Sequence, residues 1–238
     1  MDNRLCEIVA ERLGSDPIEK GVATFLNPYS YLRLRSRPDL VQEFDRIYFD
    51  GISMVWLGRL LGVRCDRQSF DQTGLAGVVL DDAARRGLSV AFIGGEAGIA
   101  AESARILAQE HHGLRVTIVS PGFFESRAER AGVIDRICEA SVDLVVVGMG
   151  VVAQEAFVCD LIATGWRGVA YTCGGYLRQT CKAGLDYYPD WADRLNLRWL
   201  YRIIDEPVLL RRYTIEYPRA LARIVSDFVA YRFRRLAR

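Results

Sequence analysis

The chain has 238 residues, 50% of them hydrophobic, and its formal net charge at pH 7 is +1. This length suits one large α/β domain or one domain with a small appendage, and the balanced charge argues against a nucleic-acid-binding protein. The N-terminus is too charged for a signal peptide, and no apolar run approaches the roughly 20 residues needed to span a bilayer.

The cysteines indicate the cellular compartment, and the histidines limit the kinds of site that the chain can form. The six cysteines include no C-x-x-C pair and several lie in apolar stretches, which favours reduced thiols in a cytoplasmic protein. The two histidines, His111 and His112, are adjacent, and adjacent side chains point apart on most backbones. We therefore expect neither a metal site nor a Ser-His-Asp triad.

Apolar strand-like runs alternate along the chain with amphipathic segments of helical length. In chain order, we expect a strand at 21–26, a helix at 37–47, a strand at 47–51, a helix at 75–87, a strand at 88–95, a helix at 96–113, a strand at 114–122, a helix at 127–140, a strand at 142–150, a helix at 153–165 and a strand at 167–175. This alternation predicts an α/β fold with a Rossmann-like, mostly parallel sheet and helices on both faces.

The pattern changes after about Tyr188. Residues 189–238 are rich in arginine and aromatic residues, and the stretch from Arg211 to the C-terminus has eight arginines and two acidic residues, a net charge of +6. We therefore expect an α/β domain at 1–188 and a C-terminal helical basic appendage at 189–238.

The end of the appendage predicts an amphipathic helix. Its apolar residues recur at helical spacing, at Leu221, Ile224, Val225, Phe228 and Tyr231. Such a helix could lie on an anionic membrane, where each nearby arginine contributes about 1 kcal/mol. It could instead pack on the core of the domain or on another subunit.

Four predicted strands end in small or polar residues: Asn27, Asp50-Gly51, Gly94-Gly95 and Gly148-Met149-Gly150. In a doubly wound sheet, ligands bind beyond the carboxyl ends of the strands. Glycines let a ligand approach the backbone, and a following helix N-terminus attracts phosphate. Each glycine pair taken alone is equally consistent with a simple turn.

Three polar side chains at these strand ends have two interpretations each. Asp50 could act as a general base on a hydroxyl group, or it could simply form an Asp-Gly turn. Gln154 and Glu155 could cap the helix that they begin, or they could point into a cleft.

Six segments together carry a resemblance to a known family. They are, in order, LNPYSY, FDGISMVWLGRLLG, VAFIGGEAG, PGFF, VDLVVVGMGVVAQEAF and LNLRWLYRIIDEP with a following RRY. Over roughly residues 20 to 215 the chain resembles the WecG/TagA/CpsF glycosyltransferase family (glycosyltransferase family 26). The most specific pieces are Asp50-Gly51, the Gly-x-Gly-x-x-x-Gln-Glu at 148–155, and the Trp-Leu-Tyr-Arg and Glu-Pro at 199–207.

The resemblance implies transfer of a hexose or N-acetylhexosamine from a UDP-sugar to a polyprenyl-diphosphate-linked saccharide, with inversion. Such an enzyme serves exopolysaccharide or cell-envelope polysaccharide synthesis, needs no metal or other cofactor, and works as a peripheral protein on the anionic inner face of the plasma membrane. Residues 1–188 would then bind the nucleotide sugar and catalyse transfer, and residues 189–238 would face the membrane. Self-association of the chain stays open.

Two other functions compete with this one. A non-catalytic nucleotide-sugar-binding assembly partner could share the same scaffold. A Rossmann oxidoreductase is disfavoured, because no acidic residue follows the glycine turn at about 20 residues in a clear strand-end setting.

The family also implies roles for individual residues. Asp50 resembles the general base, and Gln154 resembles the glutamine of the glycine-rich motif, so these two are the expected catalytic residues. The expected substrate-binding residues are Asn27, Gly51, Arg67, Gly94, Gly95, Gly148, Gly150, Glu155, Gly174, Gln179, Arg202 and Arg212.

The chain also departs from the family pattern at several positions. Phe25 stands where a threonine is usual, Val152 replaces a proline, and Leu209 replaces a second arginine of the appendage. Asp71 and Gln179 lie where family aspartates are expected, and which of them substitutes is open. These departures favour a subgroup with its own donor or acceptor.

Overall fold

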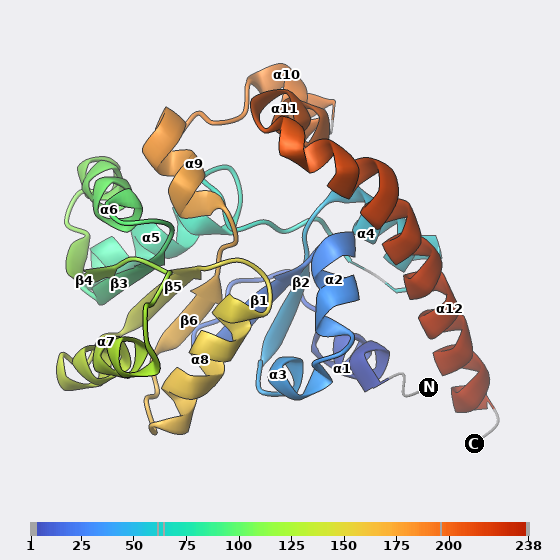
Figure 1. Ribbon diagram of the computed structural model, residues 1–238, viewed down its shortest axis with the longest axis horizontal. Coiled ribbons are helices and arrows are strands. Elements are labelled where there is room, and N and C mark those ends of the chain that lie inside the picture. The colour runs from blue at the N-terminus through green and yellow to red at the C-terminus, as the bar shows by residue number, and fades with distance from the viewer. Residues whose placement is uncertain (1–3, 61, 64, 196, 237–238) are drawn as a thin grey trace.

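The computed structural model describes residues 4–60, 62–63, 65–195 and 197–236 (Figure 1). Arg238, the last arginine of the predicted basic tail, lies outside the described residues. Six strands form one sheet in the order β2-β1-β6-β5-β3-β4, and every neighbouring pair is parallel. The strands are β1 (Gly21–Leu26), β2 (Arg46–Phe49), β3 (Ser89–Gly94), β4 (Arg115–Ser120), β5 (Leu144–Gly148) and β6 (Val169–Thr172).

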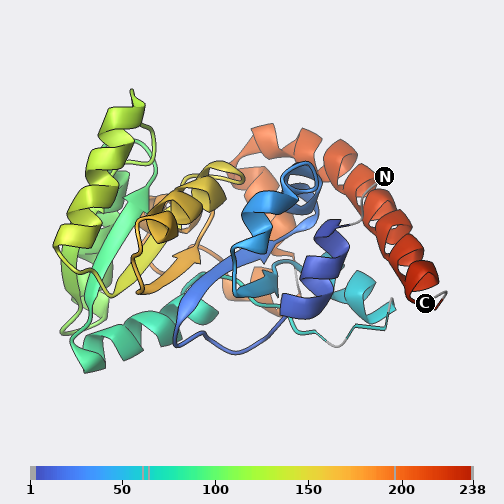
Figure 2. The same cartoon turned by 90° about the horizontal axis from the view of Figure 1, so that it is seen from below.

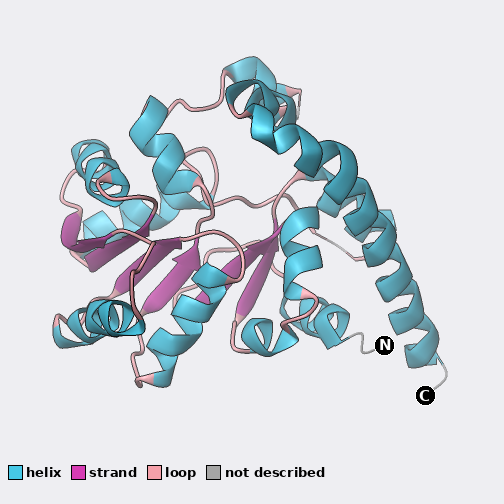
Figure 3. Cartoon of the chain, viewed as in Figure 1, coloured by secondary structure: helices cyan, strands magenta, loops and turns pink. Residues whose placement is uncertain are grey.

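The central strands are buried on both faces, as their continuous apolar sequence predicts. Along β5, Leu144 and Val146 pack on one side of the sheet while Val145 and Val147 pack on the other. The helices on the first side are α5 (Leu75–Arg86), α6 (Ile99–Glu110) and α9 (Tyr176–Ala183). Those on the second side are α7 (Arg127–Glu139) and α8 (Ala153–Ala163) (Figure 3). The predicted fold class is confirmed.

A separate apolar cluster surrounds the β1–β2 end of the sheet. It contains Leu26, Ile47 and Phe49 from the strands together with side chains of the nearby helices. The helices at this end are α1 (Arg4–Arg12), α2 (Pro28–Leu34), α3 (Pro38–Gln42) and α4 (Ile52–Leu60). Two of them, α2 and α4, begin just after Asn27 and Gly51, so this cluster holds both strand ends in place.

The C-terminal segment passes over the carboxyl ends of the strands and then turns down beside the sheet (Figures 1 and 2). Its elements are α10 (Asp190–Arg194), α11 (Arg198–Asp205), the 3₁₀ turn η1 (Pro207–Leu209), the π-helical turn η2 (Arg212–Glu216) and α12 (Tyr217–Leu236). None of the helices in the described ranges combines the length and the apolar character that crossing a bilayer requires.

The long helix α12 exists, but its apolar side is not free. Ile224 and Phe228 are 1% and 3% exposed and join the cluster that contains α1 and α2. Leu221 and Tyr231 pack against the same cluster, whereas Val225 remains exposed. Of the placements that the sequence leaves open for this stripe, the structure has it packed on the chain's own domain.

The observed helices differ from the predicted ones in two further respects. Within the helix predicted at 37–47 only α3 forms, because the chain turns at Asp45 to enter β2. There the Asp45 backbone N–H donates to Val22 O at 2.9 Å, and its carboxylate accepts from Val22 N at 2.8 Å. Helices α2 and α4 were not predicted, since each follows a strand without an intervening loop.

Candidate active site

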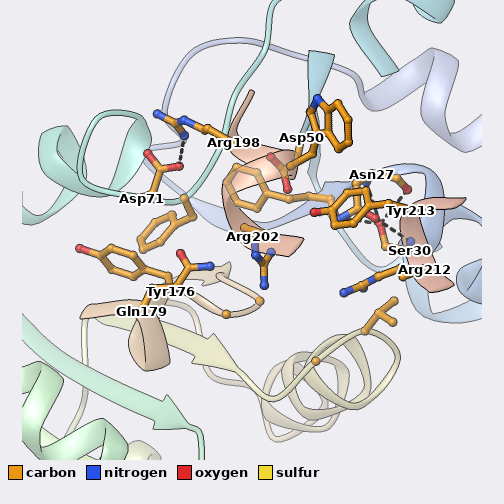
Figure 4. Close-up of a pocket in the computed structure, with 18 of the residues that line it drawn as sticks. Asn27, Ser30, Asp50, Asp71, Tyr176, Gln179, Arg198, Arg202, Arg212 and Tyr213 are labelled. Atoms are coloured by element: carbon orange, nitrogen blue, oxygen red, sulfur yellow. Dashed lines mark hydrogen bonds and ion pairs between the residues drawn. The ribbon is translucent and has the colours of Figure 1, made fainter. Parts of the chain in front are cut away.

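A cavity of about 1290 Å³ lies between the strand ends and the C-terminal segment (Figure 4). Residues that follow β1, β2, β5 and β6 form its floor, and residues of α11, η2 and α12 form the opposite wall. Most of the predicted site residues line it: Asn27, Asp50, Gly51, Arg67, Gly95, Gly148, Gly150, Gln154, Gly174, Gln179, Arg202 and Arg212. Gly94 and Glu155 lie outside the lining.

Asp50 lies directly after β2, where its backbone N–H donates to Leu26 O at 2.9 Å. Burial raises the pKa of its carboxyl group, and the nearby carboxylate of Asp71 raises it further. Arg202, a hydrogen bond from the Asn27 side chain and Arg198 act in the opposite direction. A carboxylate with a raised pKa, half-buried beside a cavity, has the properties of a general base.

Asn27 is oriented by the start of α2. Its side-chain oxygen accepts the backbone N–H of Ser30 at 3.0 Å, and its own backbone N–H donates to Ser30 Oγ at 2.8 Å. This reciprocal cap occupies the oxygen of the amide. The amide nitrogen is then the end that faces Asp50 as a donor.

Gln154 and Glu155 form a buried polar network beneath the cavity. Glu155 Oε1 accepts from Thr24 Oγ1 at 3.0 Å and from Gln154 Nε2 at 2.9 Å, and Oε2 accepts the Val152 N–H at 2.6 Å. Burial raises the pKa of Glu155. Gln154 Oε1 accepts the Gly174 N–H at 3.2 Å. Glu155 therefore sits behind the cavity wall and holds Gln154 in place, where substrate contact had been expected.

The turn before α8 has an unusual backbone. Val152 has φ of 75°, a conformation that is a rare outlier for a β-branched residue. The Glu155 carboxylate and the Ala156 N–H, which donates to Val152 O at 2.9 Å, hold this turn. Glu155 thus caps the backbone N–H of the residue that precedes α8.

Gly94 and Gly148 serve close packing of strand ends. A Cβ on Gly94 would lie 2.4 Å from Gly148 O, and a Cβ on Gly148 would lie 2.9 Å from Cys173 Sγ. Gly94 therefore belongs to the support of the cavity, while Gly148 also lines it. The sequence indicates that both positions require glycine. For Gly94 the reason is close contact with the backbone of Gly148.

Two arginines of the C-terminal segment point into the cavity (Figure 4). Arg212 stacks 3.7 Å from the ring centre of Tyr29, and Arg202 has Glu206 at 3.9 Å. Within the described residues, the Nε atoms of both arginines are buried without a hydrogen-bond partner. A Cβ on Gly175 would lie 3.6 Å from Arg202 Nη2 and 3.4 Å from Gln179 Nε2, so both groups flank this backbone. The arrangement suits an anionic ligand.

Sequence reasoning missed Arg198, which pairs with Asp71 at the cavity wall at 2.5 Å. It also missed the aromatic lining from Tyr188, Tyr213 and Trp56. The spacing of Arg198 and Arg202 places both on one helical face, and this could be read from the sequence. That Arg198 pairs with Asp71, 127 residues earlier in the chain, could not. Across the part of the chain that is described, no group of three or more His, Cys, Asp or Glu side chains could hold a metal ion.

Comparisons with known proteins agree with this geometry. The profile of the Glycosyl transferase WecG/TagA/CpsF family matches residues 2–234. A UDP-Gal:alpha-D-GlcNAc-diphosphoundecaprenol beta-1,4-galactosyltransferase of Shigella boydii is 31% identical over 87% of this chain and 86% of its own length. An N-acetylglucosaminyldiphosphoundecaprenol N-acetyl-beta-D-mannosaminyltransferase of Bacillus spizizenii is 27% identical over 73% of this chain and 65% of its own length.

Proposed function

Because this chain belongs to the WecG/TagA/CpsF family of glycosyltransferases, we propose that it transfers a hexose or N-acetylhexosamine from a UDP-sugar to a polyprenyl-diphosphate-linked saccharide. The Shigella boydii and Bacillus spizizenii relatives are both named for lipid-diphosphate acceptors and β-linked products. Since UDP-sugars of this kind are α-linked, a β-linked product requires inversion at the anomeric carbon. Synthesis of an exopolysaccharide or a cell-envelope polysaccharide is the setting that this reaction fits.

One observation carries the proposal. Asp50, whose pKa is raised by burial and by Asp71, shares a cavity with the guanidinium groups of Arg202 and Arg212. A proton acceptor beside two cations is what an inverting transfer needs, because a hydroxyl group must lose a proton while a diphosphate leaves. The cavity volume of about 1290 Å³ leaves room for a sugar nucleotide and an acceptor sugar.

The reaction then follows from these groups. Asp50 takes the proton of an acceptor hydroxyl as its oxygen attacks the anomeric carbon of the donor sugar. The bond between that carbon and the β-phosphate oxygen breaks, and its electron pair stays on the departing UDP. Arg202 and Arg212 stabilise the charge that grows on the diphosphate. Gln154, fixed by Glu155 and Gly174, retains one N–H for a substrate hydroxyl.

The direct test is a donor screen with a lipid-linked acceptor. UDP-galactose, UDP-glucose and UDP-N-acetylmannosamine are each incubated with N-acetylglucosaminyl-diphosphate-polyprenol, and UDP release and product linkage are measured. We expect one donor to give a β-linked product. Failure of every donor with every lipid-diphosphate acceptor, with UDP still bound, would favour the non-catalytic assembly partner.

The reaction is proposed to proceed without a metal or other cofactor, since two arginines are available to the leaving group. We expect turnover to persist in excess EDTA. The measurement is UDP release before and after dialysis against the chelator, with added Mg²⁺ as the comparison. Loss of turnover that Mg²⁺ restores would assign the diphosphate to a metal instead.

The mouth of the cavity supports the membrane-associated part of the proposal. Exposed apolar side chains line the cavity, and we call four of them the apolar rim: Trp56, Leu195, Trp199 and Leu210. Arg211 and Arg219, both exposed, lie in the same C-terminal segment. Exposed apolar groups and exposed cations in one segment suit the surface of an anionic membrane. We propose that the rim, rather than α12, meets the lipid from which the acceptor is drawn.

A further inference from the structure

Arg198, on the first turn of α11, reaches across to the loop between α4 and α5. Its guanidinium donates to Asp71 Oδ2 at 2.5 Å, to Ser69 Oγ at 3.4 Å, and to Thr73 Oγ1. The same group lies 4.7 Å from the ring centre of Tyr188. The side chains of Arg198 and Asp71 are 13% and 14% exposed, so water screens this pair little.

Asp71 is held by its own loop as well. Ser69 Oγ donates to Asp71 Oδ2 at 2.6 Å, and Thr73 Oγ1 donates to Oδ1 at 3.1 Å. Every one of these contacts places a donor against the carboxylate. The loop therefore fixes Asp71 at the cavity wall as an acceptor of hydrogen bonds, and Arg198 supplies the balancing charge (Figure 4).

The pair matters because Asp71 and Asp50 line the same side of one cavity. After burial, Asp71 is the largest cause that raises the pKa of Asp50, while Arg202 and Arg198 lower it. Other charged, polar or titratable groups that line this site are Asn27 after β1, Arg67 after α4, Tyr176 and Arg178 in α9, Tyr188 before α10, Tyr213 and Arg212 in η2, and Tyr217 in α12. Glu96 also lines the cavity, but it follows β3 near the other side of the sheet.

We propose that Arg198 is a positioning residue that pairs with Asp71, neutralises this second carboxylate, and so favours the ionised, proton-accepting form of Asp50. The proposal rests on the proposed role of Asp50 as the base. Without Arg198, Asp71 would present an uncompensated charge both to Asp50 and to the diphosphate of an incoming donor. Arg198 binds the loop that carries Asp71 through Nη1 and Nη2, and its own positive charge acts on Asp50 in the same direction.

The sign of each variant follows from charge alone. R198A removes a cation and exposes Asp71, so the pKa of Asp50 rises. D71N removes an anion and leaves Arg198 uncompensated, so that pKa falls. The double variant R198A/D71N removes both charges and lies between the two single variants. The two single variants should therefore shift the Asp50 titration in opposite directions.

The experiment reads the titration of Asp50 directly. Protein labelled with ¹³C at aspartate carboxyls is titrated by NMR, and the Asp50 signal is assigned by its absence in D50N. This readout does not depend on turnover. The acid limb of kcat/KM with the preferred UDP-sugar is measured in parallel, and it should move with the titration, while R198A also raises KM for the donor.

Control variants separate charge from folding. R105A removes an exposed arginine that pairs with Glu102 on α6, and it should leave the Asp50 titration unchanged. If R198A does not fold, R198K keeps a charge with poorer geometry and should give a smaller shift of the same sign. An Asp50 titration that is the same in wild type, R198A and D71N overturns the proposal, and so does a double variant outside the range of the single variants.

Failure of the proposed function would look different. Wild-type protein that moves no sugar contradicts the glycosyltransferase reaction, yet the NMR titrations still decide whether Arg198 sets the charge state of Asp50. Active wild-type protein with unmoved titrations contradicts the role of Arg198 alone.

Discussion

At the scale of single residues, position after a strand decides the chemistry of Asp50. The end of β2 places the carboxyl group half-buried, next to Asn27 and within the field of Asp71. Burial penalises the charged form, so the folded protein favours the protonated form of this group more than the unfolded chain does. A general base must be ionised, so the proposed role of Asp50 lowers the free energy of unfolding.

D50N should separate these two effects. Turnover should fall by about 10² to 10⁴-fold, the usual worth of a general base. Because the folded-state pKa of Asp50 is raised, its contribution to stability is fully present below the pKa of the unfolded chain and is lost as pH rises through the folded-state value. At pH 8 the thermal midpoint of D50N should therefore exceed that of the wild type, and at pH 4 the two should converge. Calorimetry at both pH values provides the measurement; a D50N protein that is less stable at pH 8 would contradict the assignment.

Glu155 offers a second prediction at this scale. Three donors converge on its carboxylate, from Thr24, Gln154 and the Val152 backbone. E155Q would turn an N–H group against at least one of them, at a cost of about 1–3 kcal/mol. We expect a lower denaturation midpoint and a lower kcat, because Gln154 loses its anchor.

E129Q is the matched control for this substitution. Glu129 occupies the equivalent place in the first turn of α7, but it is exposed, and its carboxylate accepts the Glu125 N–H at 2.7 Å. It should change neither stability nor turnover appreciably. Equal behaviour of E155Q and E129Q would mean that the buried network contributes nothing.

The sequence revealed residues whose chemistry is local, and it hid those that depend on distant partners. Asp50 and Gln154 follow apolar strands, and the carboxyl ends of parallel strands meet at one edge, so their convergence could be predicted. The roles of Glu155 and Gly94 were misjudged, because adjacent letters do not say which side chain faces the cavity. Arg198 could not be found, because Asp71 lies in another segment.

At the scale of elements, an ion pair joins α12 to the domain beside the apolar contacts of that helix. Arg35 binds Asp227 through Nε–Oδ2 at 2.6 Å and Nη2–Oδ1 at 3.0 Å. The Tyr31 hydroxyl donates to Asp227 Oδ2 at 3.2 Å and lies 2.8 Å from Cys6 Sγ. Burial raises the pKa of both Tyr31 and Cys6, the latter to about 12, so neither carries a charge near neutral pH.

D227N should release this helix. Asp227 is 6% exposed and Arg35 is 21% exposed, and removal of the carboxylate leaves the guanidinium partly buried without its partner. We expect a loss of about 2 kcal/mol or more in the free energy of unfolding, measured by urea denaturation. D82N, which breaks exposed pairs with Arg85 and Arg86, should cost less than about 1 kcal/mol. Similar losses in the two variants would show that α12 is held by apolar contacts alone.

Elements differed in how far their sequence foretold them. The buried strands were predicted because apolar runs of that length have few alternatives in an α/β chain. Helix α12 was also predicted, but not which partner its apolar stripe would meet. Packing on α1 and α2 and binding to a membrane both satisfy the same spacing, and only the tertiary arrangement distinguishes them.

At the scale of the whole molecule, the C-terminal segment brings exposed apolar side chains to the cavity. Trp56 comes from α4, whereas Leu195, Trp199 and Leu210 come from a segment more than a hundred residues later. No pattern within either segment indicates that they share a cavity. The rim therefore lay beyond sequence analysis, although the appendage itself did not.

The rim should govern binding to vesicles. Wild-type protein should sediment with liposomes that contain phosphatidylglycerol, and W199S/L210S should bind at least tenfold more weakly, since burial of such side chains contributes about 1.5–3 kcal/mol each. F233S, which alters an exposed residue on α12, is the control and should bind normally. Loss of binding in F233S but not in W199S/L210S would place the membrane contact on α12, and a rim buried by self-association would appear in size-exclusion chromatography.

Three of the four tryptophans, Trp56, Trp191 and Trp199, are 64%, 46% and 43% exposed, while Trp166 is 9% exposed. Two of the exposed indoles, those of Trp56 and Trp199, line the cavity. Binding of a nucleotide, a sugar or a bilayer there should change the wavelength and intensity of the tryptophan emission, without an attached dye. Tryptophan fluorescence can therefore report binding at the cavity, and the buried Trp166 should respond least.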